Sequence, residues 1–102
     1  MQSENIPIYQ KKDFEKMREA GSLAAHVLDQ LYELIKPGIT TLEINDFCHD
    51  LILKNNAVPA PLNYKGFPKS VCTSVNHVVC HGIPNEKKFL NVGDIINVDV
   101  TV

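Results

Sequence analysis

The end of the chain, from Asp94 to Val102, constrains the fold more than any other segment because its side chains alternate with a period of two. Ile96, Val98, Val100 and Val102 are apolar, and Asn97, Asp99 and Thr101 stand between them. Successive residues of a β-strand point to opposite faces, so the pattern predicts a strand with one buried face and one polar face. Asp99 lies in the middle of the polar face. A bare apolar strand is an unusual end for a sheet, and we therefore expect this sequence to be part of something larger.

A helix is predicted before this strand, between Lys12 and Ile35. Apolar and small residues recur there at steps of three and four, which is one stripe of an amphipathic helix. The stripe consists of Phe14, Met17, Gly21, Ala24, Leu28, Leu31 and Ile35. Lys36-Pro37-Gly38 ends the helix, because proline cannot continue it and glycine tolerates the turn.

A second helix is predicted from Thr40 to about Asn55, since Thr40 and Glu43 have the spacing of a capping box. The residues expected to face inward are Leu42, Phe47 and Leu51. A strand over residues 70–75 and a loop over 81–91 follow. The order helix, helix, strand, loop, strand is typical of an α+β fold, and no domain boundary or internal repeat is visible.

Composition and charge limit the classes of function. The chain has 102 residues, of which 44% are hydrophobic and 22% charged, with a net charge of −2. This charge gives no argument for nucleic acid or an anionic membrane as a partner. No apolar run reaches the roughly 18 residues of a membrane span, and residues 1–5 lack the features of a secretion signal. Three cysteines without a Cys-x-x-Cys pair suggest free thiols, so we expect a cytoplasmic protein.

Several residues could carry chemistry. Asp99 is either a solvated carboxylate on the wet face of the sheet or a metal ligand held by a rigid strand. His81 precedes Gly82-Ile83-Pro84, which implies a defined backbone path and an imidazole aimed at a target. A zinc site made of Cys72, His77, Cys80 and His81 is an alternative. It is less favoured, because structural zinc ligands usually come in pairs separated by two to five residues, whereas Cys80 and His81 are adjacent.

Several separated segments, taken in order, resemble the type I methionine aminopeptidases, which have the pita-bread metallopeptidase fold. They are residues 64–81 (YKGFPKSVCTSVNHVVCH), Gly82-Ile83-Pro84, the run from Gly93, the helix around Met17-Arg18 and Ala20-Gly21, and Lys36-Pro37-Gly38. The resemblance covers nearly everything after Asp13 but less than half of a usual family member. It implies that residues 1–102 are the N-terminal portion of a single catalytic domain, with two helices packed on an antiparallel sheet.

The resemblance also implies roles for individual residues. Asp99 would be the first of five metal-binding residues, the others (an Asp, a His and two Glu) lying beyond Val102. His81 matches the family's active-site His, which contacts the substrate near the scissile amide and can donate a hydrogen bond to a developing oxyanion. Tyr64, Phe67 and Cys72 match the wall that receives the methionine side chain, an aromatic and a thiol suiting a thioether. Phe67 stands where many members have Tyr, and Pro61 where some have Cys.

The implied activity is removal of the initiator methionine from nascent polypeptides when the next residue is small. Two divalent ions, of cobalt, manganese or iron, would activate a water molecule for attack on the amide, and a monovalent cation would lie near Asn76 and Val78. The expected partners are nascent N-termini and the ribosome. The 102 residues alone lack four of five ligands, so we expect them to be inactive and to self-associate through the final strand.

Two alternatives stay open. The chain could be a non-catalytic fragment or binding half-domain, or it could belong to a pita-bread relative that cleaves before proline. Residues 64–81 argue against that relative.

Overall fold

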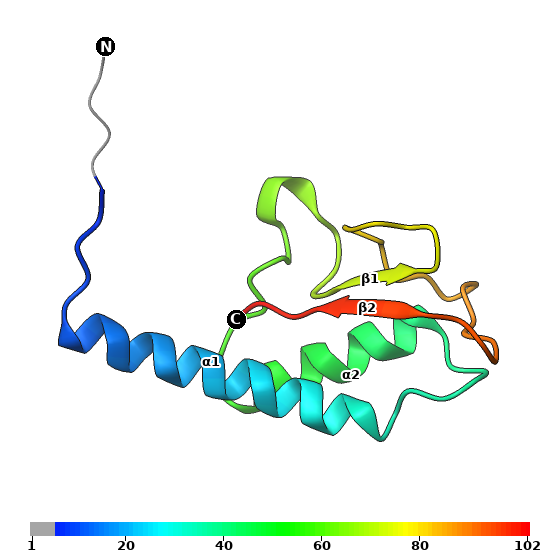
Figure 1. Ribbon diagram of the computed structural model, residues 1–102, viewed down its shortest axis with the longest axis horizontal. Helices are drawn as coiled ribbons and strands as arrows, with labels where there is room; N and C mark the ends of the chain where they lie inside the picture. Colours follow the sequence, from blue (N-terminus) through cyan, green and yellow to red (C-terminus); the bar gives the residue numbers. More distant parts are fainter. Residues whose placement is uncertain (1–5) are drawn as a thin grey trace, which may run out of the picture.

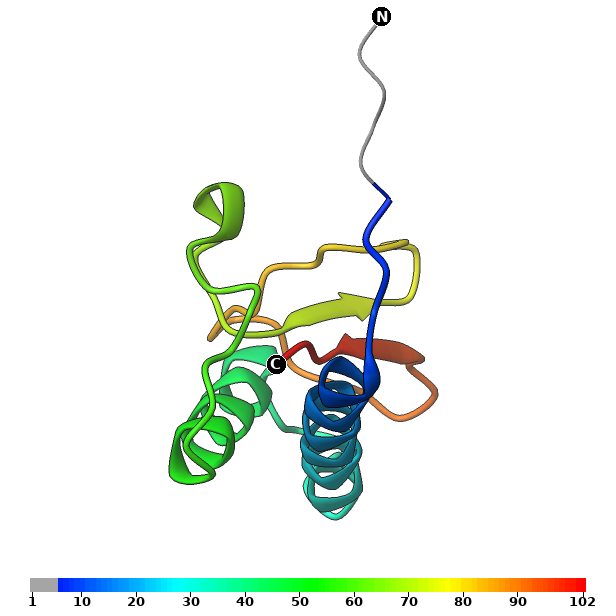
Figure 2. The ribbon, with the colours of Figure 1, turned by 90° about the vertical axis from the view of Figure 1, so that its left-hand side faces the viewer.

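The computed structural model describes residues 6–102 and has the helices on one side of a small sheet (Figure 1). Two helices, α1 (Lys11–Tyr32) and α2 (Thr41–Lys54), lie side by side beneath the sheet. The sheet pairs β1 (Cys72–Val75) with β2 (Ile96–Asp99) in antiparallel orientation. A short 3₁₀ helix, η1 (Tyr64–Gly66), and the loop that follows β1 lie on the other side of the sheet (Figure 2). The predicted α+β class and antiparallel pairing are confirmed, but both strands are shorter than the predicted ranges 70–75 and 94–102.

Helix α1 is confirmed, but it ends at Tyr32, before the predicted end at Ile35, and its predicted buried stripe is largely wrong. Its buried residues are Val27 and Leu31, while Phe14, Met17 and Leu28 of the predicted stripe are exposed. The N-terminal half of α1 projects past α2 and the sheet (Figure 1), and its large apolar side chains, Phe14 and Met17, are more than half exposed. A periodic sequence shows which side of a helix is apolar, but it does not show how much of the helix's length has a neighbour.

Helix α2 begins where the capping pattern predicts, with the backbone nitrogen of Glu43 donating to Thr40 Oγ1 over 3.1 Å. Its buried line differs from the predicted one. The apolar residues buried along it are Ile44, Cys48 and Ile52, whereas Leu42, Phe47 and Leu51 are half-buried. Because α2 packs against both α1 and β1, the centre of its buried face falls between these two neighbours.

The register of the sheet separates a core face from a second face. Val98 lies opposite Thr73 and Ile96 opposite Val75, and the two β2 residues pack against the apolar core. Asp99 lies opposite Cys72 and Asn97 opposite Ser74 on the other face. All four β1 residues are buried, since helices lie beneath this strand and a loop lies above it, whereas β2 alternates as predicted.

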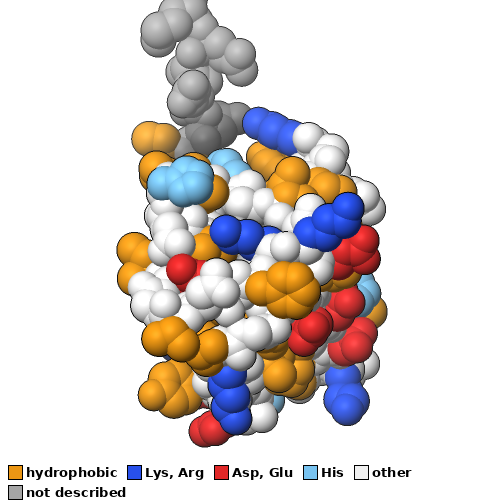
Figure 3. Space-filling model, turned by 90° about the vertical axis from the view of Figure 1, so that its right-hand side faces the viewer, with side chains coloured by type: hydrophobic (Ala, Val, Ile, Leu, Met, Phe, Trp, Pro, Cys, Tyr) orange, Lys and Arg blue, Asp and Glu red, His pale blue; other side chains and the backbone are white. Residues whose placement is uncertain are grey.

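Charged side chains of both signs lie on the loop end of the molecule. The loop end of the molecule has apolar side chains interspersed with basic and acidic ones (Figure 3). In residues 6–102, no helix combines the length and the apolar character needed to cross a membrane.

Candidate functional site

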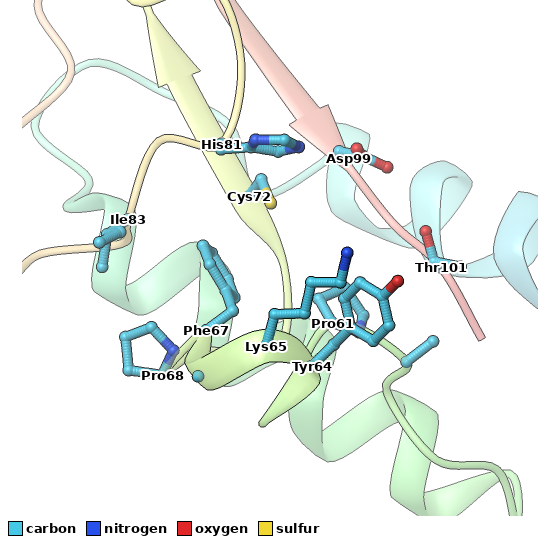
Figure 4. A pocket seen from close by; sticks show the side chains of 12 residues that line it. Pro61, Tyr64, Lys65, Phe67, Pro68, Cys72, His81, Ile83, Asp99 and Thr101 are labelled. Atoms are coloured by element: carbon cyan, nitrogen blue, oxygen red, sulfur yellow. The ribbon is translucent and has the colours of Figure 1, made fainter.

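A pocket of about 720 Å³ opens on the face of the sheet that points away from the helices (Figure 4). Its lining includes the five residues to which the family resemblance gives a catalytic, substrate-binding or divalent-metal role: Tyr64, Phe67, Cys72, His81 and Asp99. Four different segments supply them, namely η1 and the residue after it, β1, the loop after β1, and β2. Residues up to 35 positions apart in the sequence are thus brought to one cavity.

Asp99 and Cys72 form the floor of the pocket as direct partners across the two strands. Cys72 is buried, and burial, followed by the negative charge of Asp99, raises the pKa of its thiol. Asp99 is exposed, and its carboxylate oxygens are the donors that divalent ions accept. One carboxylate is a partial ligand set: no three His, Cys, Asp or Glu side chains come together as a metal site within residues 6–102.

This arrangement gives the zinc alternative no support. Cys72 and His81 line the pocket, but His77 and Cys80 are not part of its lining.

Two hydrogen bonds between β1 and the loop that follows it hold His81 over the pocket. Thr73 N donates to Gly82 O over 2.8 Å, and Gly82 N donates to Ser74 Oγ over 3.1 Å. His81 itself has φ of +57°, a left-handed conformation that is uncommon outside glycine but less so for His. The imidazole extends above Cys72 on the side of Asp99 (Figure 4).

The opposite wall of the pocket comes from a tight turn at η1. Asn63 N donates to Phe67 O over 2.8 Å, and Phe67 N donates to Tyr64 O over 2.9 Å. The turn also contains positive φ at Asn63 (+66°), Lys65 (+48°) and Gly66 (+81°). These bonds fix Tyr64 and Phe67 on one side of the cavity, as Figure 4 shows.

Two polar residues of the lining, Lys65 and Thr101, were not predicted from the sequence. The ammonium of Lys65 lies 5.5 Å from the centre of the Tyr64 ring. Thr101 follows Asp99 by two residues on the polar stripe, and this spacing was a signal that could have found it. For Lys65 the sequence offers no such signal.

Asn76 has a structural task at the end of β1. Its Nδ2 donates to Asp94 Oδ1 over 3.0 Å, and Ile95 N donates to its Oδ1 over 3.1 Å. The side chain thereby ties the turn after β1 to the segment that enters β2. The monovalent cation near Asn76 and Val78 stays a prediction.

The sequence was also compared with known proteins. The model of metallopeptidase family M24 matches residues 15–102. The chain belongs to this family. Methionine aminopeptidase from Rickettsia prowazekii is 63% identical over 97 residues, a match covering 95% of this chain and 37% of that protein.

Solved structures agree with this assignment. The crystal structure of the Rickettsia prowazekii enzyme superposes with a TM-score of 0.91 at 61% identity, covering 94% of this chain and 38% of that one. Methionine aminopeptidase from Thermotoga maritima gives 0.90 at 34% identity, covering 94% and 39%. A Xaa-Pro dipeptidase from Bacillus anthracis gives 0.72 at 17% identity, covering 93% and 25%, which is a likeness of fold. The predicted pita-bread fold is confirmed, and the chain spans under two-fifths of the methionine aminopeptidases that it matches.

Proposed function

We propose that this chain forms the N-terminal part of a methionine aminopeptidase that removes the initiator methionine from polypeptides. The observation that carries the proposal is that one pocket gathers an apolar wall, an imidazole and a carboxylate. The identity of 63% to a methionine aminopeptidase supports the same activity and substrate. The remainder of the catalytic domain would lie beyond Val102.

Asp99 would be the first ligand of the metal centre. Its carboxylate is exposed and lines the pocket, which fits a hard or borderline divalent ion such as manganese, iron or cobalt. When bound, such ions polarise the amide carbonyl and activate water for hydrolysis. Since Asp99 is the single carboxylate in the described pocket, the other ligands would come from residues after Val102.

The remaining lining residues would bind and orient the substrate. The rings of Tyr64 and Phe67 and the buried thiol of Cys72 offer a thioether an apolar, polarisable surface. The imidazole N–H of His81 would donate to the carbonyl oxygen of the scissile amide as negative charge develops there. In this proposal the substrates are nascent N-termini, met in the cytoplasm at the ribosome, and a monovalent cation near Asn76 and Val78 is structural.

The test compares the 102-residue chain with the full-length parent protein, using a Met-Ala-Ser peptide and added manganese or cobalt. We expect methionine release from the full-length protein and none from the 102 residues, because four ligands are missing. Asp99→Ala should abolish release, and His81→Ala should reduce it by about a hundred- to thousandfold. Glu86→Gln, which alters an exposed loop carboxylate outside the pocket, is the matched control and should keep the rate.

Two outcomes would overturn the proposal. Turnover by the 102-residue chain that Asp99→Ala abolishes would show that the missing ligands are not needed. Hydrolysis of an Ala-Pro peptide in preference to Met-Ala-Ser would assign the protein to the proline-directed relatives instead.

A further inference from the structure

Next to His81, the loop is hydrogen-bonded to the middle of β1 through Gly82. The carbonyl oxygen of Gly82 accepts from Thr73 N, and its nitrogen donates to Ser74 Oγ. The first bond joins backbone to backbone and survives most substitutions. The second depends on the Ser74 hydroxyl, which belongs to a side chain only 4% exposed. Ser74 is therefore the β1 side chain whose hydrogen bond to Gly82 fixes this part of the loop.

His81 needs this support because its own backbone conformation is unfavourable. A non-glycine residue at positive φ persists only where the surroundings enforce it. The imidazole is exposed and makes no hydrogen bond to another residue within 6–102. Its placement over the pocket is thus set by the backbone, and the adjacent Gly82 is the nearest point at which that backbone is tied down.

Ser74 does not line the pocket, and it lies on the same face of β1 as Cys72, which does. We propose that Ser74 is a positioning residue for His81, whose hydroxyl holds Gly82 so that the imidazole stays over the pocket. The inference rests on the proposed function, in which His81 contacts the scissile amide. It adds a residue that contacts neither substrate nor metal.

The test is a double-mutant cycle in the full-length protein, with Ser74→Ala, His81→Asn and the pair. Asparagine tolerates the left-handed conformation, so His81→Asn removes the imidazole with little disturbance of the backbone. Ser74→Ala should lower kcat for Met-Ala-Ser about three- to tenfold, the worth of one hydrogen bond, with KM nearly unchanged. In the His81→Asn background the same substitution should lower kcat less than twofold, because Ser74 acts on kcat through the imidazole, which this background lacks.

The chain offers a matched control in Thr73→Val. This change removes a hydroxyl from the neighbouring residue of the same strand, and that hydroxyl has no hydrogen-bond partner within residues 6–102. It should leave kcat unchanged in both backgrounds. Ser74→Thr, which keeps the hydroxyl, should retain the wild-type rate, and Ser74→Cys serves if Ser74→Ala does not fold.

A second measurement is independent of catalysis. Hydrogen exchange at the Gly82 amide should accelerate at least tenfold in Ser74→Ala and stay unchanged in Thr73→Val. Equal losses of kcat in the two His81 backgrounds, or an unchanged exchange rate at Gly82, would overturn the inference. The wild-type protein could instead release no methionine while Ser74→Ala still accelerates exchange at the Gly82 amide. That result would refute the proposed function and leave the hydrogen bond from Gly82 to Ser74 established.

Discussion

Thr73 N lies 2.8 Å from the carbonyl oxygen of Gly82, so the loop after β1 occupies the edge of the sheet where a further strand would pair. The approach is so close that a Cβ atom at position 82 would overlap the Thr73 carbonyl oxygen. Position 82 therefore requires glycine, because the Thr73 backbone cannot move aside for a side chain. The φ angle of Gly82 is not positive, so it is not the reason for glycine here.

Gly82→Ala should consequently destabilise the protein by about 1–3 kcal/mol, as overpacking does, and move His81 away from the pocket. Gly21→Ala is the matched control, because a Cβ there meets nothing within 4 Å. Since Gly21 lies inside α1, this substitution should stabilise by about 0.5–1 kcal/mol. Urea denaturation of both variants of the full-length protein checks the opposite signs. Equal stability of the two would contradict the close contact at Gly82.

The buried hydroxyl of Thr73 leads to a second prediction. Its Oγ1 has no hydrogen-bond partner within residues 6–102, and Thr73 is 4% exposed. A buried polar atom without a partner costs about 1–3 kcal/mol, and valine has nearly the same shape without that atom. We expect Thr73→Val to be neutral or stabilising by up to about 1 kcal/mol in thermal unfolding. A clear loss of stability would mean that a residue outside 6–102 bonds to this hydroxyl.

The three thiols should react at very different rates. Cys80 is exposed, whereas Cys48 is fully buried and burial raises its pKa to about 11. Only the thiolate reacts with iodoacetamide, so Cys48 at pH 8 is protected both by its pKa and by the core around it. We expect Cys80 to be alkylated first and Cys48 only after unfolding, as followed by mass spectrometry of peptides. Labelling of Cys48 in the native protein would place it outside the core.

Asp94 should make stability depend on acid pH. Hydrogen bonds from the Asn76 side chain and the Asn91 backbone nitrogen lower the pKa of its carboxyl. A carboxyl with a lowered folded-state pKa contributes stability above its unfolded pKa, and this contribution disappears as pH falls through the folded value. Asp94→Asn should therefore flatten the acid side of a Tm–pH profile, whereas Glu86→Gln, the control, should not. Parallel profiles for wild type and Asp94→Asn would refute this role.

The sequence was sufficient for features that depend on local pattern. The alternation in residues 96–102 predicted which residues of β2 face the core, and the Thr40–Glu43 spacing predicted the start of α2. The separated motifs that resemble the family also named five residues that the structure brings to one pocket. Their proposed roles remain to be tested by mutation.

Features that depend on distant neighbours were not predictable. The exposure of Phe14 and Met17 follows from how far α1 projects beyond α2, which no periodicity encodes. Lys65 enters the pocket through a left-handed turn that Asn63 and Gly66 favour, but these two residues do not indicate that the Lys65 side chain points into a cavity. The hydrogen bond from Gly82 to Ser74 joins residues eight positions apart whose contact appears only in the folded chain.

The outer edge of β2 gives the last prediction. Within residues 6–102, β2 pairs with β1 on one side and with no strand on the other. Its apolar residues, including Ile96 and Val98, are partly buried against the helices. What lacks a partner strand within residues 6–102 is therefore the row of backbone groups along the outer edge of β2. Edges of this kind pair with further strands, and a second copy of the chain offers the same edge. We therefore expect the 102-residue chain to self-associate as its concentration rises.

Size-exclusion chromatography with light scattering across a wide concentration range checks this expectation, and extending the chain beyond Val102 should restore a monomer. Ile95→Lys adds a charge at the start of β2, at a residue that is 71% exposed, and it should weaken the association. Val79→Lys is the matched control, because it makes the same kind of change at a residue 91% exposed outside the strands. Equal weakening by both variants would attribute association to general surface hydrophobicity. A monomer at every concentration would show that the outer edge of β2 does not pair with a second copy of these 102 residues.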